Sequence, residues 1–317
     1  MDISVVIPLY NEEESLNELV SWIERVMADH GFRFEIILVD DGSEDSSWNV
    51  IFQMASSKKH VKGIRFRRNY GKSAALFSGF REASGEVVIT MDADLQDSPD
   101  EIPELYRMIK EENYHMVSGW KKKRHDPVTK TIPSRFYNWV ARKVTGIRLH
   151  DFNCGLKAYR GDVVKNIEVY GEMHRYIPVL VKQSGFSRIG EKKVQHNRRK
   201  YGVTKFGMER FINGALDLLS ISFMTRFGKR PMHLFGSLGT LLFLLGFAAA
   251  VYLGARKLYH LSHGIPSILV TDSPYFYIAL TCMILGSLFF IAGFLGELIS
   301  RNSPIRNFYA IDEKINL

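Results

Sequence analysis

Two acidic residues follow an apolar segment in the first third of the chain. The segment is Val87–Met91, and Asp92 and Asp94 come directly after it, one residue apart. A buried strand that ends in this way places both carboxylates at the carboxyl edge of a sheet, where open α/β sheets bind ligands. Close carboxylates repel each other and lose hydration, and a divalent cation relieves both costs. Oxygen ligands suit Mg²⁺ or Mn²⁺ bound together with a substrate phosphate. The pattern therefore predicts a metal and phosphate site, although alone it would also fit a solvated turn.

Polar residues follow two other apolar segments in the same way. Ile3–Leu9 leads into the polar residues 10–12, and Phe34–Val39 leads into the acids at 40–41. The carboxyl ends of parallel strands lie at one edge of a sheet. We therefore expect the three strand ends to supply polar groups to a single crevice. The alternative is that these segments are ordinary polar turns with no shared role.

The elements that must position these strand ends alternate along the chain. Further strands are predicted over residues 61–66 and 116–118. Amphipathic spacing predicts four helices, over residues 12–30, 46–57, 71–83 and 99–112. Near-continuous apolar strands that alternate with amphipathic helices predict an α/β fold with a mostly parallel sheet covered on both faces.

The chain between residues 121 and 205 is less regular. A run of four cations, Lys121–Arg124, is by itself typical of a solvated loop. The remaining pattern predicts a helix over 135–145, a strand over 156–159, a helix from Met173 to about Gly185, a strand over 188–194 and a basic loop over 197–205.

Composition limits the classes of function. The net charge of +8 favours phosphate-rich partners or an anionic membrane surface. Nucleic acid is not expected as a partner, because no basic stripe is interleaved with stacking aromatic residues and no zinc-ligand spacing occurs. Two cysteines give no disulfide framework. The first residues lead straight into a strand without a charged leader region, so no signal peptide is expected.

The composition changes after Phe206. Residues 206–227 are rich in Phe, Leu, Ile and Met with sparse charges, which predicts an amphipathic helix at a membrane interface. Leu234–Leu253 and Tyr275–Leu295 are uncharged and long enough to span a bilayer. Small residues at 246, 250 and 254 recur every four positions, which permits close helix packing and a homo-oligomer.

Cations bracket the two predicted spans unequally. Those on the side of the large domain and the tail are Arg226, Lys229, Arg230, Arg301, Arg306 and Lys314. The connection between the spans carries only Arg256 and Lys257. This bias predicts an integral protein of the inner (cytoplasmic) membrane with the large domain in the cytoplasm.

Several motifs together resemble the family 2 glycosyltransferases with the GT-A, Rossmann-like fold. Within that family they resemble the polyprenyl-phosphate glycosyltransferases, such as dolichol-phosphate mannose synthases and bactoprenol glucosyltransferases. The motifs are Pro8-x-Tyr10-Asn11-Glu12, Val39-Asp40-Asp41-Gly42-Ser43, Asn69-x-Gly71-Lys72, Asp92-Ala93-Asp94-Leu95-Gln96-Asp97 and Arg199-x-x-Gly202-x-Thr204-Lys205.

The resemblance implies a role for each group of residues. The nucleoside would be held by Pro8, Tyr10, Glu12 and Asp41. The metal and diphosphate would be held by Asp92, Asp94 and Gln96. The cations placed to meet phosphate or the lipid acceptor are Lys121, Arg124, Arg175, Arg199 and Lys205. Asp94, as direct metal ligand, and Asp151, as a base or an orienting group, would be the catalytic carboxylates.

The resemblance also implies the reaction and the domain plan. It is an inverting transfer of a hexose from a nucleotide sugar, with UDP-glucose favoured, to undecaprenyl or another polyprenyl phosphate. The plan is a glycosyltransferase domain over residues 1–205, an interfacial helix over 206–230 and a two-span region with a short tail over 231–317. The alternatives are a GDP-mannose-dependent mannosyltransferase, a processive polysaccharide synthase, whose Gln-x-x-Arg-Trp motif is missing here, and a non-catalytic membrane scaffold.

Overall fold

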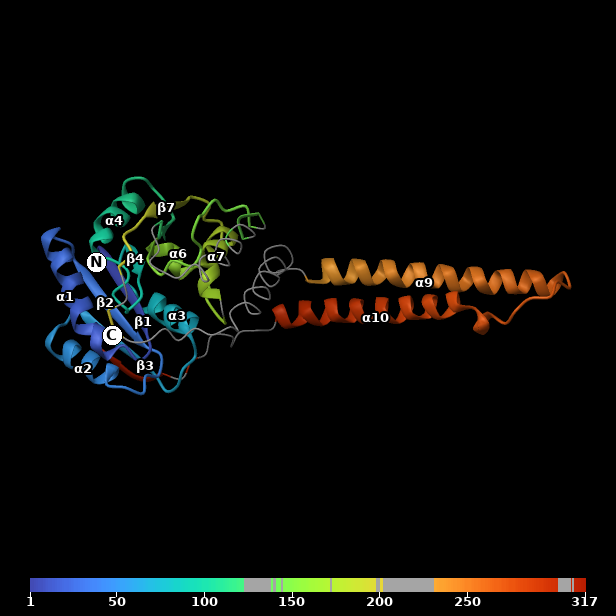
Figure 1. Cartoon of the computed structure of the whole chain (residues 1–317), viewed down its shortest axis with the longest axis horizontal. Coiled ribbons are helices and arrows are strands. Elements are labelled where there is room, and N and C mark those ends of the chain that lie inside the picture. The colour runs from blue at the N-terminus through green and yellow to red at the C-terminus, as the bar shows by residue number, and fades with distance from the viewer. Residues whose placement is uncertain are drawn as a thin grey trace. The chain divides into compact units, whose positions relative to one another are not determined.

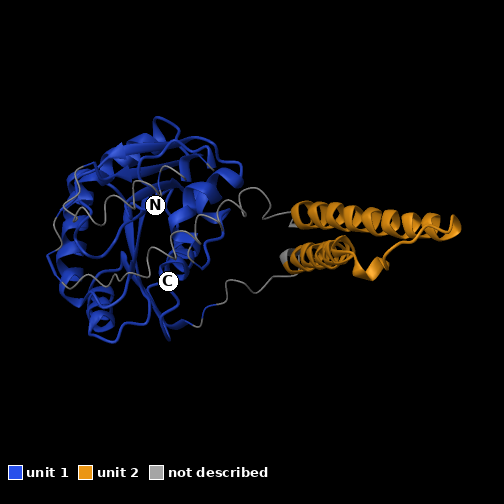
Figure 2. Cartoon of the chain, turned by 45° about the vertical axis from the view of Figure 1, so that its right-hand side comes forward, with its two compact units in different colours: residues 1–222, 306–317 blue, residues 223–305 orange. Residues whose placement is uncertain are grey.

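The computed structural model describes residues 1–122, 138, 141–143, 145–171, 173–197, 200–201, 231–301, 309 and 311–317. The chain divides into two compact units (Figure 2). The first comprises Met1–Ser222 and Arg306–Leu317, and the second comprises Phe223–Ile305. The helices predicted over 135–145 and 206–227 lie mostly or wholly outside the described residues.

The first unit is built on an eight-stranded sheet (Figure 1). In chain order the strands are β1 (Ile3–Leu9), β2 (Phe34–Asp40), β3 (Val61–Phe66), β4 (Val87–Thr90), β5 (Met116–Trp120), β6 (Lys157–Arg160), β7 (Ile189–Lys193) and β8 (Ile311–Ile315). Their order across the sheet is β7-β5-β6-β4-β1-β2-β3-β8. The central strands β4, β1, β2 and β3 are parallel, whereas β6 and β8 run antiparallel to their neighbours. The predicted α/β fold with a mostly parallel sheet is therefore confirmed.

Helices cover both faces of this sheet (Figure 1). On one face lie α1 (Glu13–Asp29), α2 (Ser47–Ser57) and α4 (Ile102–Lys110), packed on inward residues such as Val5 and Ile7 of β1. On the other lie α3 (Lys72–Glu82), α6 (Gly161–Lys165) and α7 (Ile177–Gln183), packed on residues such as Val6. Every residue of β1 is buried, because alternate side chains enter different cores.

Strand β8 corrects the expectation that the residues after the second span form a short tail. Residues 311–315 pair with β3 and cover its edge. The Trp48 indole donates a hydrogen bond to Glu313 at 3.1 Å, and the Asn316 side chain donates to two backbone carbonyls of the first unit. An edge strand keeps one face in water, which explains why the sequence Ile-Asp-Glu-Lys-Ile is largely polar. From the sequence alone, such a segment looks like an irregular tail.

The second unit contains two long apolar helices, α9 (Pro231–Ser262) and α10 (Pro274–Arg301). By length and composition both could cross a membrane. The predicted spans lie within them. Because Gly239 packs on Gly286 and Gly246 packs on Ala279, the helices are antiparallel.

The contact face of these helices differs from the expected one. A Cβ added at Gly239 would lie 2.6 Å from the Gly286 carbonyl oxygen, so both glycines are needed for the close approach. Gly246 also takes part, but a Cβ at Gly254 would meet nothing within 4 Å. The spacing of four residues is therefore not the packing stripe within this hairpin, which follows a spacing of seven.

Candidate active site

The Asp-x-Asp sequence forms a turn directly after β4. The backbone N–H of Gln96 donates to Asp94 Oδ1 at 3.2 Å, and Leu95 between them has φ = 59°. This left-handed conformation is uncommon for a residue other than glycine, asparagine or aspartate, and backbone strain of this kind concentrates at functional sites. The turn leaves Asp92 and Asp94 partly exposed at the carboxyl edge of the sheet, as predicted.

Asp92 is held between a lysine and a glycine. Lys72, the first residue of α3, forms an ion pair with Asp92 Oδ1. Burial raises the pKa of Asp92, but the charges of Lys72 and Lys121 outweigh it and lower that pKa to about 2. On the other side, a Cβ added at Gly155 would lie only 2.5 Å from Asp92 Oδ2. Asp92 is therefore an ionised carboxylate in a fixed position.

Asp94 has the opposite electrostatic environment. Burial and the negative charges of Asp92 and Asp97 raise its pKa to about 6. A bound cation would remove this unfavourable charge density. The described residues contain no group of three or more His, Cys, Asp or Glu side chains that could hold a metal. The residues at this turn fit a Mg²⁺ or Mn²⁺ ion that takes its remaining ligands from a diphosphate and water. Among the described ion pairs, lysines pair with Asp92 and Asp97 but not with Asp94, so Asp94 is the protein carboxylate best placed to bind the metal.

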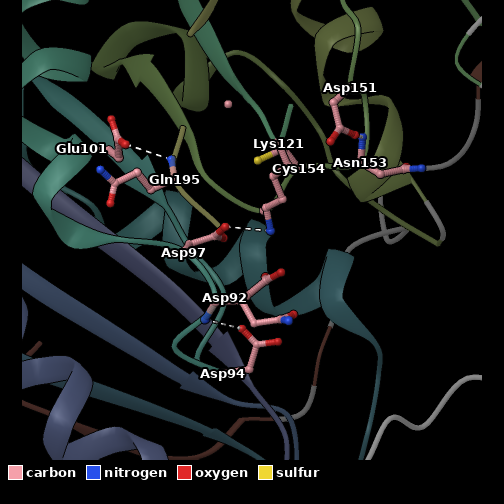
Figure 3. Close-up of polar contacts among 12 residues, drawn as sticks. Asp92, Asp94, Asp97, Glu101, Lys121, Asp151, Asn153, Cys154 and Gln195 are labelled. Atoms are coloured by element: carbon pink, nitrogen blue, oxygen red, sulfur yellow. Dashed lines mark hydrogen bonds and ion pairs between the residues drawn. The ribbon is translucent and has the colours of Figure 1, made fainter. Parts of the chain in front are cut away.

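Lys121 lies close to the turn but has a structural partner. Its ammonium is 2.7 Å from Asp97 Oδ1, and the Asp97 side chain is fully buried (Figure 3). Burial lowers the pKa of Lys121, but the charge of Asp97 raises it well above its usual range. The side chain predicted to meet a substrate phosphate therefore neutralises a buried carboxylate of the protein.

Asp41, the predicted ligand of the base, binds the backbone of a neighbouring loop. Its two oxygens accept hydrogen bonds from the N–H groups of Tyr70 and Gly71, at 2.7 and 2.9 Å. Burial raises the pKa of Asp41 to about 6, although these bonds oppose the shift. Asp41 thus fixes the segment that leads into Lys72 at the start of α3.

The other nucleoside candidates lie on the same edge of the sheet. Pro8 of β1 lines a cavity that also reaches Asp92. The backbone N–H of Glu12 donates a hydrogen bond to Ser47 Oγ at 3.0 Å, which connects the residues after β1 to α2. Tyr10 is partly exposed between them. The structure brings these residues to one edge, but their contact with a nucleoside stays a prediction.

Beside Asp92 lies a cavity of about 170 Å³ with several cationic or basic side chains in its wall. The polar side chains that line it are those of Lys72, Thr90, Asp92, Asn153, Lys157, Tyr159, His174 and Arg175. Burial and the charges of Lys72 and Arg175 lower the pKa of His174 to about 3, so its ring is neutral at pH 7. Arg175 thus lines the same cavity as Asp92, and its contact with phosphate or acceptor stays a prediction.

Asp151, the candidate catalytic carboxylate, is buried in the loop that precedes β6. Its Oδ1 accepts a hydrogen bond from the N–H of Asn153 at 3.1 Å, and its own N–H donates to Glu191. Asn153, Cys154 and Gly155 line the cavity, whereas Asp151 is not among the lining residues. This arrangement favours the orienting role over that of a base in contact with substrate. Arg124, Arg199 and Lys205 lie outside the described residues.

The sequence did not mark two basic residues of the cavity, Lys157 and His174, as functional. Lys157 is a single lysine in a predicted strand, and no spacing marks it as functional. His174 was expected only as the opening of a helix. Lys72 could have been found, because it ends the Asn69-x-Gly71-Lys72 motif.

Comparisons with known proteins agree with this fold. The model of the family described as Glycosyl transferase family 2 matches residues 4–168, about half of the chain. Fold and match together define a glycosyltransferase. The chain belongs to glycosyl transferase family 2.

Comparison with curated relatives identifies a narrower class of glycosyltransferase. The chain is 39% identical over 268 residues to a dodecaprenyl-phosphate galacturonate synthase of Rhizobium johnstonii, covering 81% of this chain and 77% of the relative. It is 35% identical over 302 residues to an undecaprenyl-phosphate 4-deoxy-4-formamido-L-arabinose transferase of Shewanella sediminis, covering 94% and 87%. The predicted resemblance to polyprenyl-phosphate glycosyltransferases is confirmed.

A solved structure shares the fold at lower identity. Glucosyl-3-phosphoglycerate synthase of Mycobacterium tuberculosis, in complex with Mn²⁺ and UDP-glucose, aligns with a TM-score of 0.53 and 20% identity. The alignment covers 72% of this chain and 79% of that protein.

Proposed function

We propose that this protein transfers a sugar, with inversion, from a nucleotide sugar to a polyprenyl phosphate such as undecaprenyl phosphate. The observation that carries the proposal is the Asp-x-Asp turn in a chain that continues into two helices long and apolar enough to cross a membrane. Neither a soluble acceptor nor a purely structural protein would require both features.

The donor side of the reaction uses the carboxyl edge of the sheet. Breaking the bond between sugar and diphosphate leaves negative charge on the diphosphate, which must be neutralised in the transition state. Mg²⁺ or Mn²⁺ would supply that charge, bound through Asp94 with Asp92 and Gln96 nearby. Lys72 adds a cation at the same turn and fixes Asp92. A solved structure with the same fold contains Mn²⁺ and UDP-glucose, which supports this assignment.

The acceptor side requires cations and a lipid surface. A lipid phosphate is already an anionic nucleophile, so positioning matters more than removal of a proton. Arg175 lies at the cavity beside Asp92. We propose that the lipid phosphate is also contacted by Arg124, Arg199 and Lys205, and that the apolar residues 206–227 contact the membrane. Leaving the prenyl chain in the bilayer avoids about 0.8 kcal/mol for each CH₂ that would be exposed to water.

The chain path supports a cytoplasmic catalytic domain. The chain leaves the first unit, forms the antiparallel pair α9 and α10, and rejoins the sheet at β8. Two membrane crossings would therefore begin and end on the same side. The excess of Lys and Arg at these ends over the connection between the helices supports a cytoplasmic location for that side.

The transferred sugar is proposed to carry a substituent beyond its ring hydroxyl groups. UDP-glucose was favoured from the sequence, but the two relatives described above are named for galacturonate and for 4-deoxy-4-formamido-L-arabinose. Galacturonate carries a carboxylate, and 4-deoxy-4-formamido-L-arabinose carries a formamide group, neither of which is present in glucose. Proteins that share most of this chain are thus named for modified sugars, which makes a UDP-linked modified sugar the better donor hypothesis.

Transfer by the full-length protein in lipid nanodiscs would test this function. Undecaprenyl phosphate would be supplied with GDP-mannose or with each of a panel of UDP-sugars, and the lipid-linked product would be identified by mass spectrometry. We expect product with Mn²⁺, none after chelation with EDTA, and almost none with Asp94→Asn. Failure of the wild-type protein to form any lipid-linked sugar from the panel would refute the proposal.

A further inference from the structure

The loop over residues 67–71, which joins β3 to α3, supports the proposed donor site. The N–H groups of Tyr70 and Gly71 in this loop bind Asp41, at 2.7 and 2.9 Å. Lys72, the next residue, forms the ion pair with the first carboxylate of the Asp-x-Asp turn. The loop contains no helix or strand, and such segments open locally more easily than the elements they join. The donor site therefore depends on the contacts that hold this loop.

Gly42 holds the backbone of the loop. A Cβ added at Gly42 would lie 2.5 Å from the carbonyl carbon of Arg68, so the loop packs directly on this glycine. Together with the hydrogen bonds to Asp41, this contact comes from the Val39–Ser43 motif after β2. These contacts restrain the main chain of the loop, whereas the ring of Tyr70 is held by other aromatic rings.

Tyr309 contributes one of these rings. Its ring centroid lies 5.6 Å from that of Tyr70, 5.8 Å from that of Phe66 and 6.3 Å from that of Phe77. Aromatic rings at such separations attract each other by more than their buried area alone provides. Phe66 is the last residue of β3 and Phe77 lies in α3. Tyr309 therefore connects the loop to the two elements that the loop joins.

This ring comes from the far end of the chain. Tyr309 lies between α10 and β8 in the sequence, and β8 brings it to the loop, because Ile311 pairs with Phe66. The rings of Phe66 and Tyr70 also meet edge to face, at 5.6 Å and 90°, so that Tyr309 completes a group of three rings in mutual contact. The family model matches residues 4–168, so this contact lies outside the matched part of the chain.

We infer that Tyr309 is a positioning residue of the donor site, which keeps the loop over residues 67–71 in the conformation that binds the donor. This inference rests on the proposed function, in which a nucleotide sugar binds at this edge of the sheet. An apparent affinity falls in proportion to the population that is competent to bind. If loss of the ring leaves the loop in place for about a tenth of the time, the donor binds about ten-fold more weakly. The occupied site is unchanged, so kcat should change little.

Hydrogen exchange tests the position of the loop without any substrate. Deuterium uptake of the full-length protein in nanodiscs would be followed by mass spectrometry in peptides that contain Tyr70 and Gly71. Tyr309→Ala should accelerate exchange in these peptides by about ten-fold, because the two N–H groups lose their acceptor more often. Peptides from α1 should exchange as in the wild-type protein. Tyr309→Leu, which keeps the apolar volume but not the ring, replaces Tyr309→Ala if the latter does not fold.

Binding and kinetics give the second test. With Mn²⁺, Tyr309→Ala should weaken UDP binding and raise the KM for the nucleotide sugar by about ten-fold, with kcat within about three-fold of the wild-type value. Tyr309→Phe keeps the ring and should restore both values. Glu313→Ala is the matched control, because the described partners of Glu313 are Trp48 and Arg65 rather than the three rings. It should lower the thermal midpoint and keep the KM for the donor.

The pattern of results separates positioning from stability. Unchanged exchange at Tyr70 and Gly71 in Tyr309→Ala would overturn the inference. So would equal effects of Tyr309→Ala and Glu313→Ala on exchange and donor KM, since these would show only a looser sheet, or an equal loss in Tyr309→Phe. If the wild-type protein binds neither UDP nor GDP, the proposed function is wrong, and the exchange result still decides whether Tyr309 holds the loop.

Discussion

Replacing Gly155 by alanine should inactivate the enzyme while leaving it folded. The backbone at this position is not in the left-handed region, so alanine can adopt its conformation. The added methyl group would, however, lie 2.5 Å from Asp92 Oδ2 and 2.6 Å from Cγ. Ordinary contact needs about 3.5 Å, so the Asp92 carboxylate or the loop must move by about 1 Å.

The size of the effect follows from what moves. Because Asp92 is partly exposed, its carboxylate can move at little cost in stability, and we expect the free energy of unfolding to fall by no more than about 2 kcal/mol. A displacement of about 1 Å at a reacting centre can cost about 100-fold in rate, which corresponds to about 2.7 kcal/mol. The Lys72–Asp92 ion pair would shift with it.

The assay compares kcat/KM for sugar transfer with the thermal unfolding midpoint. Gly161→Ala is the matched control, because its Cβ would lie 2.6 Å from the backbone oxygen of Gly85, at the other end of β4 from the Asp-x-Asp turn. Gly161→Ala should lower the midpoint and keep kcat/KM. The reasoning is refuted if Gly155→Ala turns over at the wild-type rate, or if its activity falls only in proportion to its loss of folded protein.

Three further outcomes are expected. Asp94→Asn should lower kcat by about 100-fold or more, because the metal loses a charged ligand; activity near the wild-type level at saturating Mg²⁺ and Mn²⁺ would contradict the metal assignment. Lys121→Met should destabilise the domain by about 3–5 kcal/mol, since it leaves the buried Asp97 carboxylate unpaired. Denaturant unfolding measures this loss, and the double variant with Asp97→Asn should recover much of it if the ion pair is the cause. Deletion of residues 311–317 should lower the thermal midpoint and promote aggregation through the open edge of β3, and unchanged light scattering and midpoint would show that β8 is dispensable.

The position of β8 after both apolar helices also limits which truncations can test the role of the membrane. A chain that ends near Lys205 lacks β8 as well as both apolar helices. Its loss of activity would therefore not separate membrane docking from an incomplete sheet. A cleaner variant keeps residues 309–317 joined to the first unit through a flexible linker, and should bind nucleotide sugar but transfer poorly to long-chain polyprenyl phosphates.

The parts of the fold that were predictable depend on local pattern. β1 was expected over Ile3–Leu9 and forms there, because a strand buried on both faces is an unbroken apolar run ended by polar residues. The Asp-x-Asp turn was predictable for the same reason. β8 was not, because its sequence is polar and its partner β3 is far away in the chain.

The electrostatics of the site could be predicted only in part. The pairing of Lys121 with Asp97 depends on burial, and a run of cations gives no indication of which member turns inward. Lys157 lies in a strand whose other residues are ordinary, so only three-dimensional packing reveals that its side chain lines a cavity. The packing of Gly239 on Gly286 likewise depends on the register of two helices rather than on either sequence alone.

The position of β8 has a consequence for how the protein is made. Trp48 and Glu313, which are joined by a hydrogen bond, lie 265 residues apart, and both apolar helices are synthesised between them. While those helices emerge from the ribosome, the edge of β3 has no partner. The catalytic sheet is therefore completed only after the helices have left the ribosome. Chains interrupted during membrane insertion would keep the edge of β3 unpaired, and chaperones and proteases act on chains with such exposed strand edges.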